Sequence, residues 1–171
     1  MTTEKASAGS PQRQANPQLH EGKFPKPSSR KRVLVVDDDA DIRIALRAVL
    51  ETAGYDVSAA RDGTHALLQL GLGGETPSLI ILDLAMPGLD GVELMEALGA
   101  FKTTDKPQVI VYSAYLSDAN STRATELGAR AVLSKPLLPA QLLEVVQGCL
   151  ENREFPAASN SRSSGFGQNS A

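Results

Sequence analysis

The stretch VLVVDDDADIR at residues 33–43 joins four aliphatic residues to three consecutive aspartates, with a fourth aspartate two positions further on. The apolar run has the length and composition of a buried β-strand, and the apolar residues from Ile42 to Ala53 recur at helical spacing. Gly54 supplies a C-terminal stop for that helix. The aspartates therefore mark the junction between a strand and the helix that follows it.

Four further apolar runs alternate with four further helical patterns along the chain. This alternation predicts an α/β fold: a doubly wound (βα)5 three-layer sandwich with a five-stranded parallel sheet covered by helices on both faces. The predicted strands are Arg32–Val36, Asp56–Ala60, Leu79–Asp83, Gln108–Tyr112 and Ala131–Ser134, and the later helices are predicted over residues 62–73, 91–101, 117–128 and 139–152.

The predicted helix at residues 117–128 differs from the others in composition. Asn120, Ser121, Thr122 and Thr125 are poor helix formers, and few positions of the segment are apolar. We expect this helix to be held weakly and to shift easily.

The two ends of the chain differ from its middle in composition. Residues 1–30 and 153–171 lack apolar periodicity, so we predict a disordered basic N-terminal tail and a disordered Ser/Asn/Gly-rich C-terminal tail around a domain at residues 31–152. Residues 1–32 carry seven Lys or Arg against two Glu, whereas residues 33–152 carry 17 acidic against eight basic residues.

Several classes of protein are disfavoured by the composition. No apolar run approaches the roughly 18 residues of a membrane-spanning helix, and the first 20 residues lack the apolar stretch of a secretory signal, so we expect a cytoplasmic protein without membrane contact. Cys149 is the single cysteine, and with only two histidines the chain has no pattern for structural zinc. About 20 residues follow the last predicted helix, too few for a DNA-binding domain, so output is expected to pass through protein contacts.

Polar residues follow four of the predicted strands at the point where each strand ends. Asp37, Asp38 and Asp39 stand at the end of the first strand, Asp83 ends the third, Ser113 follows the fourth and Lys135 follows the fifth. Ligands of open parallel sheets bind beyond the carboxyl ends of the strands, where these residues converge. The sequence therefore predicts one site containing three or more carboxylates, a hydroxyl and an ammonium group.

The residue types at this edge indicate the kind of ligand. A dinucleotide site needs glycines after the first strand, and this chain has carboxylates there. Carboxylates repel a phosphate unless a divalent cation lies between them, and Mg²⁺ is typically held by one or two carboxylates, a phosphate oxygen and water. Helix capping explains Asp39 or Asp41 but leaves Asp83 unexplained, since Asp83 precedes a loop.

Four segments together resemble the receiver domain of two-component response regulators, the CheY-like family. They read VLVVDDDADIR, LIILDLAMPGLDGVEL, VIVYSAY and GARAVLSKP, and the resemblance runs from about Lys31 to Glu151. It implies a flavodoxin-like fold, and the chain length suggests a regulator of the single-domain type.

The resemblance implies that Asp83 accepts a phosphoryl group from the histidine of a sensor kinase or a phosphotransfer protein. It implies that Asp38 and Asp83 ligate Mg²⁺ directly together with the backbone carbonyl of Ala85, and that Asp37 acts through water. The domain would then catalyse its own phosphorylation and dephosphorylation without being a conventional enzyme.

The resemblance also assigns the remaining groups of the site. Ser113 would bond a phosphoryl oxygen, Lys135 would pair with the phosphoryl charge, and the Lys135–Pro136 bond would be cis. The surface from the fourth helix to the fifth would bind an unknown downstream protein and so pass on the signal. The resemblance is also compatible with a homodimer that forms on phosphorylation. One departure is Val132, which stands where the family usually has Tyr or Phe.

Two residues are expected to govern the lifetime of the phosphorylated state. In receivers, the second residue after the acceptor and the second after the hydroxyl residue flank the path of an attacking water; here they are Ala85 and Tyr115. Alanine cannot orient water by hydrogen bonding, and a bulky ring can cover the phosphoryl group. We therefore expect a comparatively long-lived phospho-aspartate.

Two alternatives remain open from the sequence. The chain also fits a haloacid-dehalogenase-like phosphatase that would use Asp37 as its nucleophile, although Asp83 then has no role. It also fits a receiver-like module that signals by docking without being phosphorylated.

Overall fold

The structure is a computed structural model that describes residues 30–71, 76–100 and 106–153. Within these residues one sheet of five parallel strands has the order β2-β1-β3-β4-β5. The strands are β1 (Arg32–Val36), β2 (Asp56–Ala60), β3 (Leu79–Leu82), β4 (Gln108–Ser113) and β5 (Ala131–Ser134), and the helices are α1 (Ala40–Thr52), α2 (Gly63–Gly71), α3 (Gly91–Ala100), α4 (Asp118–Glu126) and α5 (Pro139–Leu150).

The predicted fold class is confirmed. Two strand ends differ by one residue from the prediction: β3 stops at Leu82, and β4 continues to Ser113, which pairs with Ser134 of β5. The predicted tails lie outside the described residues except for Arg30 and Arg153, as do the predicted ends of the second helix at 72–73 and of the third at 101.

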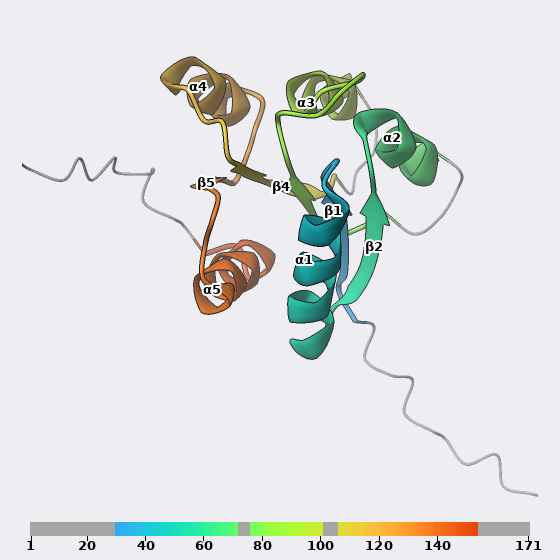
Figure 1. The fold of residues 1–171 in the computed structure, drawn as a ribbon, viewed down its shortest axis with the longest axis vertical. Helices are drawn as coiled ribbons and strands as arrows, with labels where there is room; N and C mark the ends of the chain where they lie inside the picture. Colours follow the sequence, from blue (N-terminus) through green and yellow to red (C-terminus); the bar gives the residue numbers. More distant parts are fainter. Residues whose placement is uncertain (1–29, 72–75, 101–105, 154–171) are drawn as a thin grey trace, which may run out of the picture.

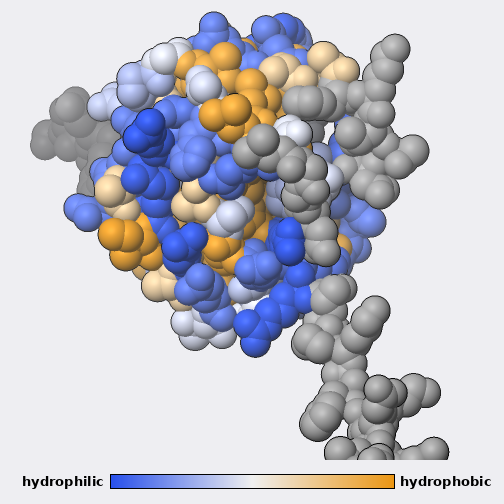
Figure 2. Space-filling view, turned by 90° about the vertical axis from the view of Figure 1, so that its right-hand side faces the viewer, coloured by the Kyte–Doolittle hydropathy of each residue, from blue (hydrophilic) through white to orange (hydrophobic). Residues whose placement is uncertain are grey.

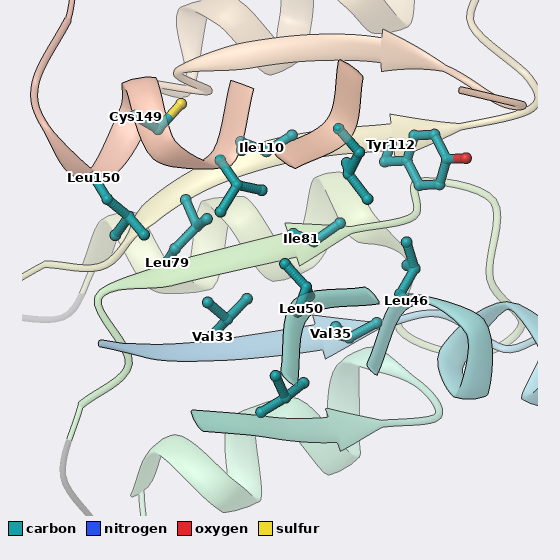
Figure 3. Packing of buried hydrophobic residues seen from close by; sticks show 13 residues of the cluster. Val33, Val35, Leu46, Leu50, Leu79, Ile81, Ile110, Tyr112, Cys149 and Leu150 are labelled. Atoms are coloured by element: carbon teal, nitrogen blue, oxygen red, sulfur yellow. The ribbon is translucent and has the colours of Figure 1, made fainter. Parts of the chain in front are cut away.

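Helices cover both faces of the sheet, α1 and α5 on one and α2, α3 and α4 on the other (Figure 1). Alternate residues of each strand point to opposite faces, which explains why the central strands read as continuous apolar runs. In β1, Val33 and Val35 pack toward α1 and α5 (Figure 3), whereas Leu34 and Val36 pack on the other face.

At the outer edge of the sheet, side chains of α1 and α2 donate hydrogen bonds to backbone carbonyls of the edge strand β2, and we call this the closed edge. The carbonyl of Val57 accepts from Arg47 Nη2 of α1 at 3.1 Å, and that of Ala59 accepts from Gln69 Nε2 of α2 at 2.9 Å. Figure 2 views the molecule from this side and shows hydrophilic residues interspersed with hydrophobic ones.

The weakly patterned segment does form a helix, α4, capped by the Ser117 hydroxyl, which accepts from the N–H of Asn120. Among the residues of α4, Ala124 alone is buried. An ion pair of 2.5 Å joins Arg123 to Glu96 of α3, and exposed pairs of this kind contribute little to stability. This sparse packing supports the expectation that α4 is held weakly.

No helix among the described residues has the length and apolar composition needed to cross a membrane.

Candidate functional site

The carboxyl ends of β1, β3, β4 and β5 bring the predicted site residues together. Asp37 follows β1, Asp83 follows β3, Ser113 ends β4 and Lys135 follows β5. Backbone hydrogen bonds fix this arrangement: the N–H of Asp83 donates to the carbonyl of Val36 at 2.9 Å, and the N–H of Lys135 donates to the carbonyl of Ser113 at 3.0 Å.

Asp83 lies at the centre of the site, with only 7% of its surface exposed. Its Oδ1 accepts from the Ser113 hydroxyl at 2.6 Å and from the N–H of Ala85 at 3.1 Å, and its Oδ2 accepts from Lys135 Nζ at 2.5 Å. Burial alone would raise the pKa of Asp83, but these donors outweigh it and hold the pKa below its usual value. Asp83 is therefore ionised near neutral pH.

Two further carboxylates stand beside Asp83. Asp37 is buried, and its side chain accepts from the N–H of Asp39 at 3.0 Å and from Lys135 Nζ at 2.6 Å. Burial raises the pKa of Asp37 above its usual value despite the bond from Lys135. Asp38 is exposed. The third aspartate of the run, Asp39, caps α1 by accepting from two backbone N–H groups, which confirms the capping interpretation.

The side chains present fit a divalent cation. Asp37, Asp38 and Asp83 each offer an oxygen, and these oxygens lie within 4.8 Å of one another. Carboxylates with room for water and a phosphate oxygen are the ligands that Mg²⁺ takes. Ala85, whose carbonyl is a predicted ligand, follows in the loop after β3 and donates its N–H to Asp83.

Lys135 bridges the acidic groups. Its ammonium bonds both Asp37 and Asp83. Burial lowers the pKa of Lys135, but the hydrogen bonds and negative charges of the two carboxylates together outweigh it, so the pKa is raised above its usual value. The bond between Lys135 and Pro136 is cis, as the family resemblance implies.

Arg43 belongs to the site but was not predicted. Its Nη1 donates to the carbonyl of Asp37 at 2.7 Å and to that of Asp38 at 2.9 Å, so it fixes the backbone that carries both carboxylates. The only signal in the sequence is its place in the first turns of the helix that follows the aspartates.

Two glycines allow the loop after Asp83 to pack closely. A Cβ on Gly91 would lie 2.3 Å from the carbonyl oxygen of Asp83, and one on Gly63 would lie 2.6 Å from that of Leu89. Neither distance leaves room for a side chain. Glycine at both positions therefore lets α2 and α3 pack against the loop that follows Asp83.

Residues 33–147 match the family described as "Response regulator receiver domain". Among curated proteins, the chain is 41% identical over 140 residues to the "Transcriptional regulatory protein PrrA" of Mycobacterium leprae. The matched region covers 81% of this chain and 58% of that protein. It is 36% identical over 138 residues to the "Regulator of RpoS" of Escherichia coli, covering 80% of this chain and 39% of that protein. The chain thus spans little more than half the length of the first relative and less of the second.

Solved structures of receiver proteins also resemble this chain. A CheY-like receiver domain protein from Methanospirillum hungatei superposes with a TM-score of 0.66 at 33% identity, covering 72% of this chain and 96% of that one. The chemotaxis protein CheY4 of Vibrio cholerae superposes with a TM-score of 0.64 at 29% identity, covering 70% of this chain and 98% of the other.

Proposed function

Because the chain belongs to the family of response regulator receiver domains, we propose that it takes a phosphoryl group onto Asp83 from a sensor histidine kinase or a phosphotransfer protein. The observation that carries this proposal is the set of contacts at one carboxylate. The ionised Asp83 is held by the Ser113 hydroxyl and the Lys135 ammonium, beside two more carboxylates that suit a divalent cation.

Phosphoryl transfer needs alignment and charge neutralisation more than covalent assistance. A carboxylate oxygen of Asp83 forms a bond to phosphorus while the bond between phosphorus and the donor's histidine nitrogen breaks, and its electron pair stays on the imidazole. Lys135 neutralises charge on the phosphoryl oxygens, and Ser113 donates its hydroxyl to one of them. Asp37, Asp38, Asp83 and the carbonyl of Ala85 would hold Mg²⁺, which when bound neutralises the phosphoryl charge.

The output step follows from the contacts of Ser113. Its hydroxyl bonds Asp83 directly, so a phosphoryl group placed on that carboxylate changes the partner of Ser113. We propose that the resulting shift reaches a downstream protein through α4, β5 and α5. Val132 of β5 packs against the hydrophobic cluster on the face of the sheet that α4 covers. Valine is smaller than the Tyr or Phe that the family usually has at this position.

The experiment that tests this function maps the phosphate. The full chain is incubated with Mg²⁺ and acetyl phosphate, and mass spectrometry of peptides locates the modification. Phosphate on Asp83 supports the proposal. Phosphate on Asp37 would instead favour the haloacid-dehalogenase-like mechanism. If neither aspartate takes phosphate, the proposal fails in favour of a receiver-like module that docks without being phosphorylated.

Lys135→Met is expected to tighten Mg²⁺ binding at least about fivefold, because it removes a positive charge that bonds two of the proposed ligands. The same change should slow phosphorylation, since the phosphoryl charge loses its partner. Titration calorimetry measures the affinity. Lys106→Met is the control, because Lys106 is exposed and donates to the carbonyl of Gly99 away from the site. Unchanged affinity in Lys135→Met would show that the ammonium does not compete with the cation.

Ala85→Asn and Tyr115→Ala are each expected to shorten the lifetime of phospho-Asp83. Asparagine at position 85 can orient a water by hydrogen bonding, and removing the Tyr115 ring opens the approach to the phosphoryl group. Tyr115 is 77% exposed, so its removal should hardly affect folding. The loss of the phosphate is followed by mass spectrometry after the donor is removed. If neither variant loses phosphate faster than the wild type, these side chains do not set the lifetime.

A further inference from the structure

Tyr112 occupies the last position of β4 before Ser113 and points to the opposite face from Val109 and Val111. It packs in the cluster formed with α1 and α5 and is 7% exposed. Figure 3 shows its hydroxyl at the carboxyl end of the strand, directed away from the apolar side chains. The ring of Tyr112 is therefore buried in the hydrophobic core, and its hydroxyl reaches the loop that carries Lys135.

Backbone N–H groups of that loop donate two hydrogen bonds to consecutive residues of β4. The N–H of Lys135 donates to the carbonyl of Ser113 at 3.0 Å, and the N–H of Leu137 donates to the Tyr112 hydroxyl at 3.2 Å. The first anchor is a backbone contact that any residue can make. The second exists only because position 112 carries a phenol.

The ring of Tyr112 also faces the ammonium group. Lys135 Nζ lies 5.6 Å from the ring centroid, within the range in which an aromatic face attracts a cation. The same ammonium bonds Asp37 and Asp83. An aliphatic residue at position 112 would fill the core but would provide neither the acceptor for Leu137 nor the ring.

We propose that Tyr112 is a positioning residue for Lys135: its hydroxyl fixes the loop and its ring stabilises the ammonium where it meets the acceptor carboxylate. The proposal rests on the proposed function, since it assigns Tyr112 to the phosphorylation of Asp83. A tyrosine that served only as core packing would contribute to stability and leave Lys135 unaffected.

The first test is a double-mutant cycle between Tyr112 and Lys135. Phosphorylation of Asp83 by acetyl phosphate is measured at saturating Mg²⁺ for Tyr112→Phe and Tyr112→Leu, each with Lys135 or with Lys135→Met. With Lys135 present, Tyr112→Phe should slow the reaction about fivefold, because it keeps the ring and loses one hydrogen bond. Tyr112→Leu should slow it about tenfold or more, because it loses both contacts.

In the Lys135→Met background, both Tyr112 substitutions should have no further effect on the rate, because the group that they position is absent. Equal slowing in both backgrounds, or no slowing in either, would overturn the proposal. Thermal unfolding of each variant identifies any loss due to misfolding.

The second test does not depend on phosphorylation. Acetic anhydride acylates free amines, and mass spectrometry reports the rate at each lysine. In Tyr112→Leu the amine of Lys135 should react several times faster than in the wild type, whereas the exposed Lys106 should be unchanged and serves as the internal control. An unchanged rate at Lys135 contradicts the proposal. If the wild type takes no phosphate at Asp83, the proposed function fails, and this second test still decides whether Tyr112 positions the lysine.

Discussion

Replacing Asp83 by asparagine is expected to abolish phosphate incorporation while leaving the fold intact. The two side chains are nearly equal in size, and an amide can still accept from Ser113, but it is not a nucleophile. Lys135 keeps Asp37 as an anionic partner. Mass spectrometry after incubation with acetyl phosphate and Mg²⁺ should show no added phosphate, and the melting temperature should stay close to that of the wild type.

The matched control is Asp38→Asn, which removes a neighbouring carboxylate but keeps the acceptor. We expect this variant to take up phosphate more slowly, since it loses a proposed ligand of Mg²⁺. Phosphate that persists on Asp37 in Asp83→Asn would refute the assignment of the acceptor.

Gly91→Ala is expected to destabilise the protein by about 2–4 kcal/mol. The new methyl group would lie 2.3 Å from the carbonyl oxygen of Asp83 and 2.7 Å from the Cα of Leu84. Both are backbone atoms, so no side-chain rotation relieves the clash. Asp83, the proposed acceptor, must be displaced, so phosphorylation should slow as well. Chemical denaturation measures the stability.

Gly99→Ala provides the comparison in the same helix. A Cβ at Gly99 meets no atom within 4 Å, so this substitution should stabilise α3 by about 0.5–1 kcal/mol. If both alanine variants were as stable as the wild type, the loop after Asp83 would be able to move freely and the packing argument would be wrong.

The sheet could be predicted because its central strands β1, β3 and β4 are buried on both faces and read as uninterrupted apolar runs. The strand boundaries were harder, because they depend on pairing. Ser113 is polar and was expected just beyond β4, yet its pairing with Ser134 extends the ladder by one residue. Asp83 was expected to close β3 but begins the following loop.

The site was predictable where a functional side chain follows directly from a strand end, as at Asp37, Asp83 and Lys135. These three lie together because the carboxyl ends of parallel strands share one edge of the sheet. Arg43 and Tyr112 were missed for a physical reason. Each acts through backbone groups of another element, and no sequence spacing reveals which carbonyl or N–H a side chain will reach.

The closed edge at β2 has a consequence for assembly. The N–H of Asp56 and the carbonyl of Ala60 form hydrogen bonds with the chain on either end of β1. Because backbone groups alternate in direction along a strand, the carbonyls of Val57 and Ala59 point away from β1, toward the edge of the sheet. Both of these carbonyls are already bonded to Arg47 and Gln69. A strand from a second molecule would have to displace both side chains before it could extend the sheet there. The two residues thus oppose intermolecular β-pairing and aggregation along this edge.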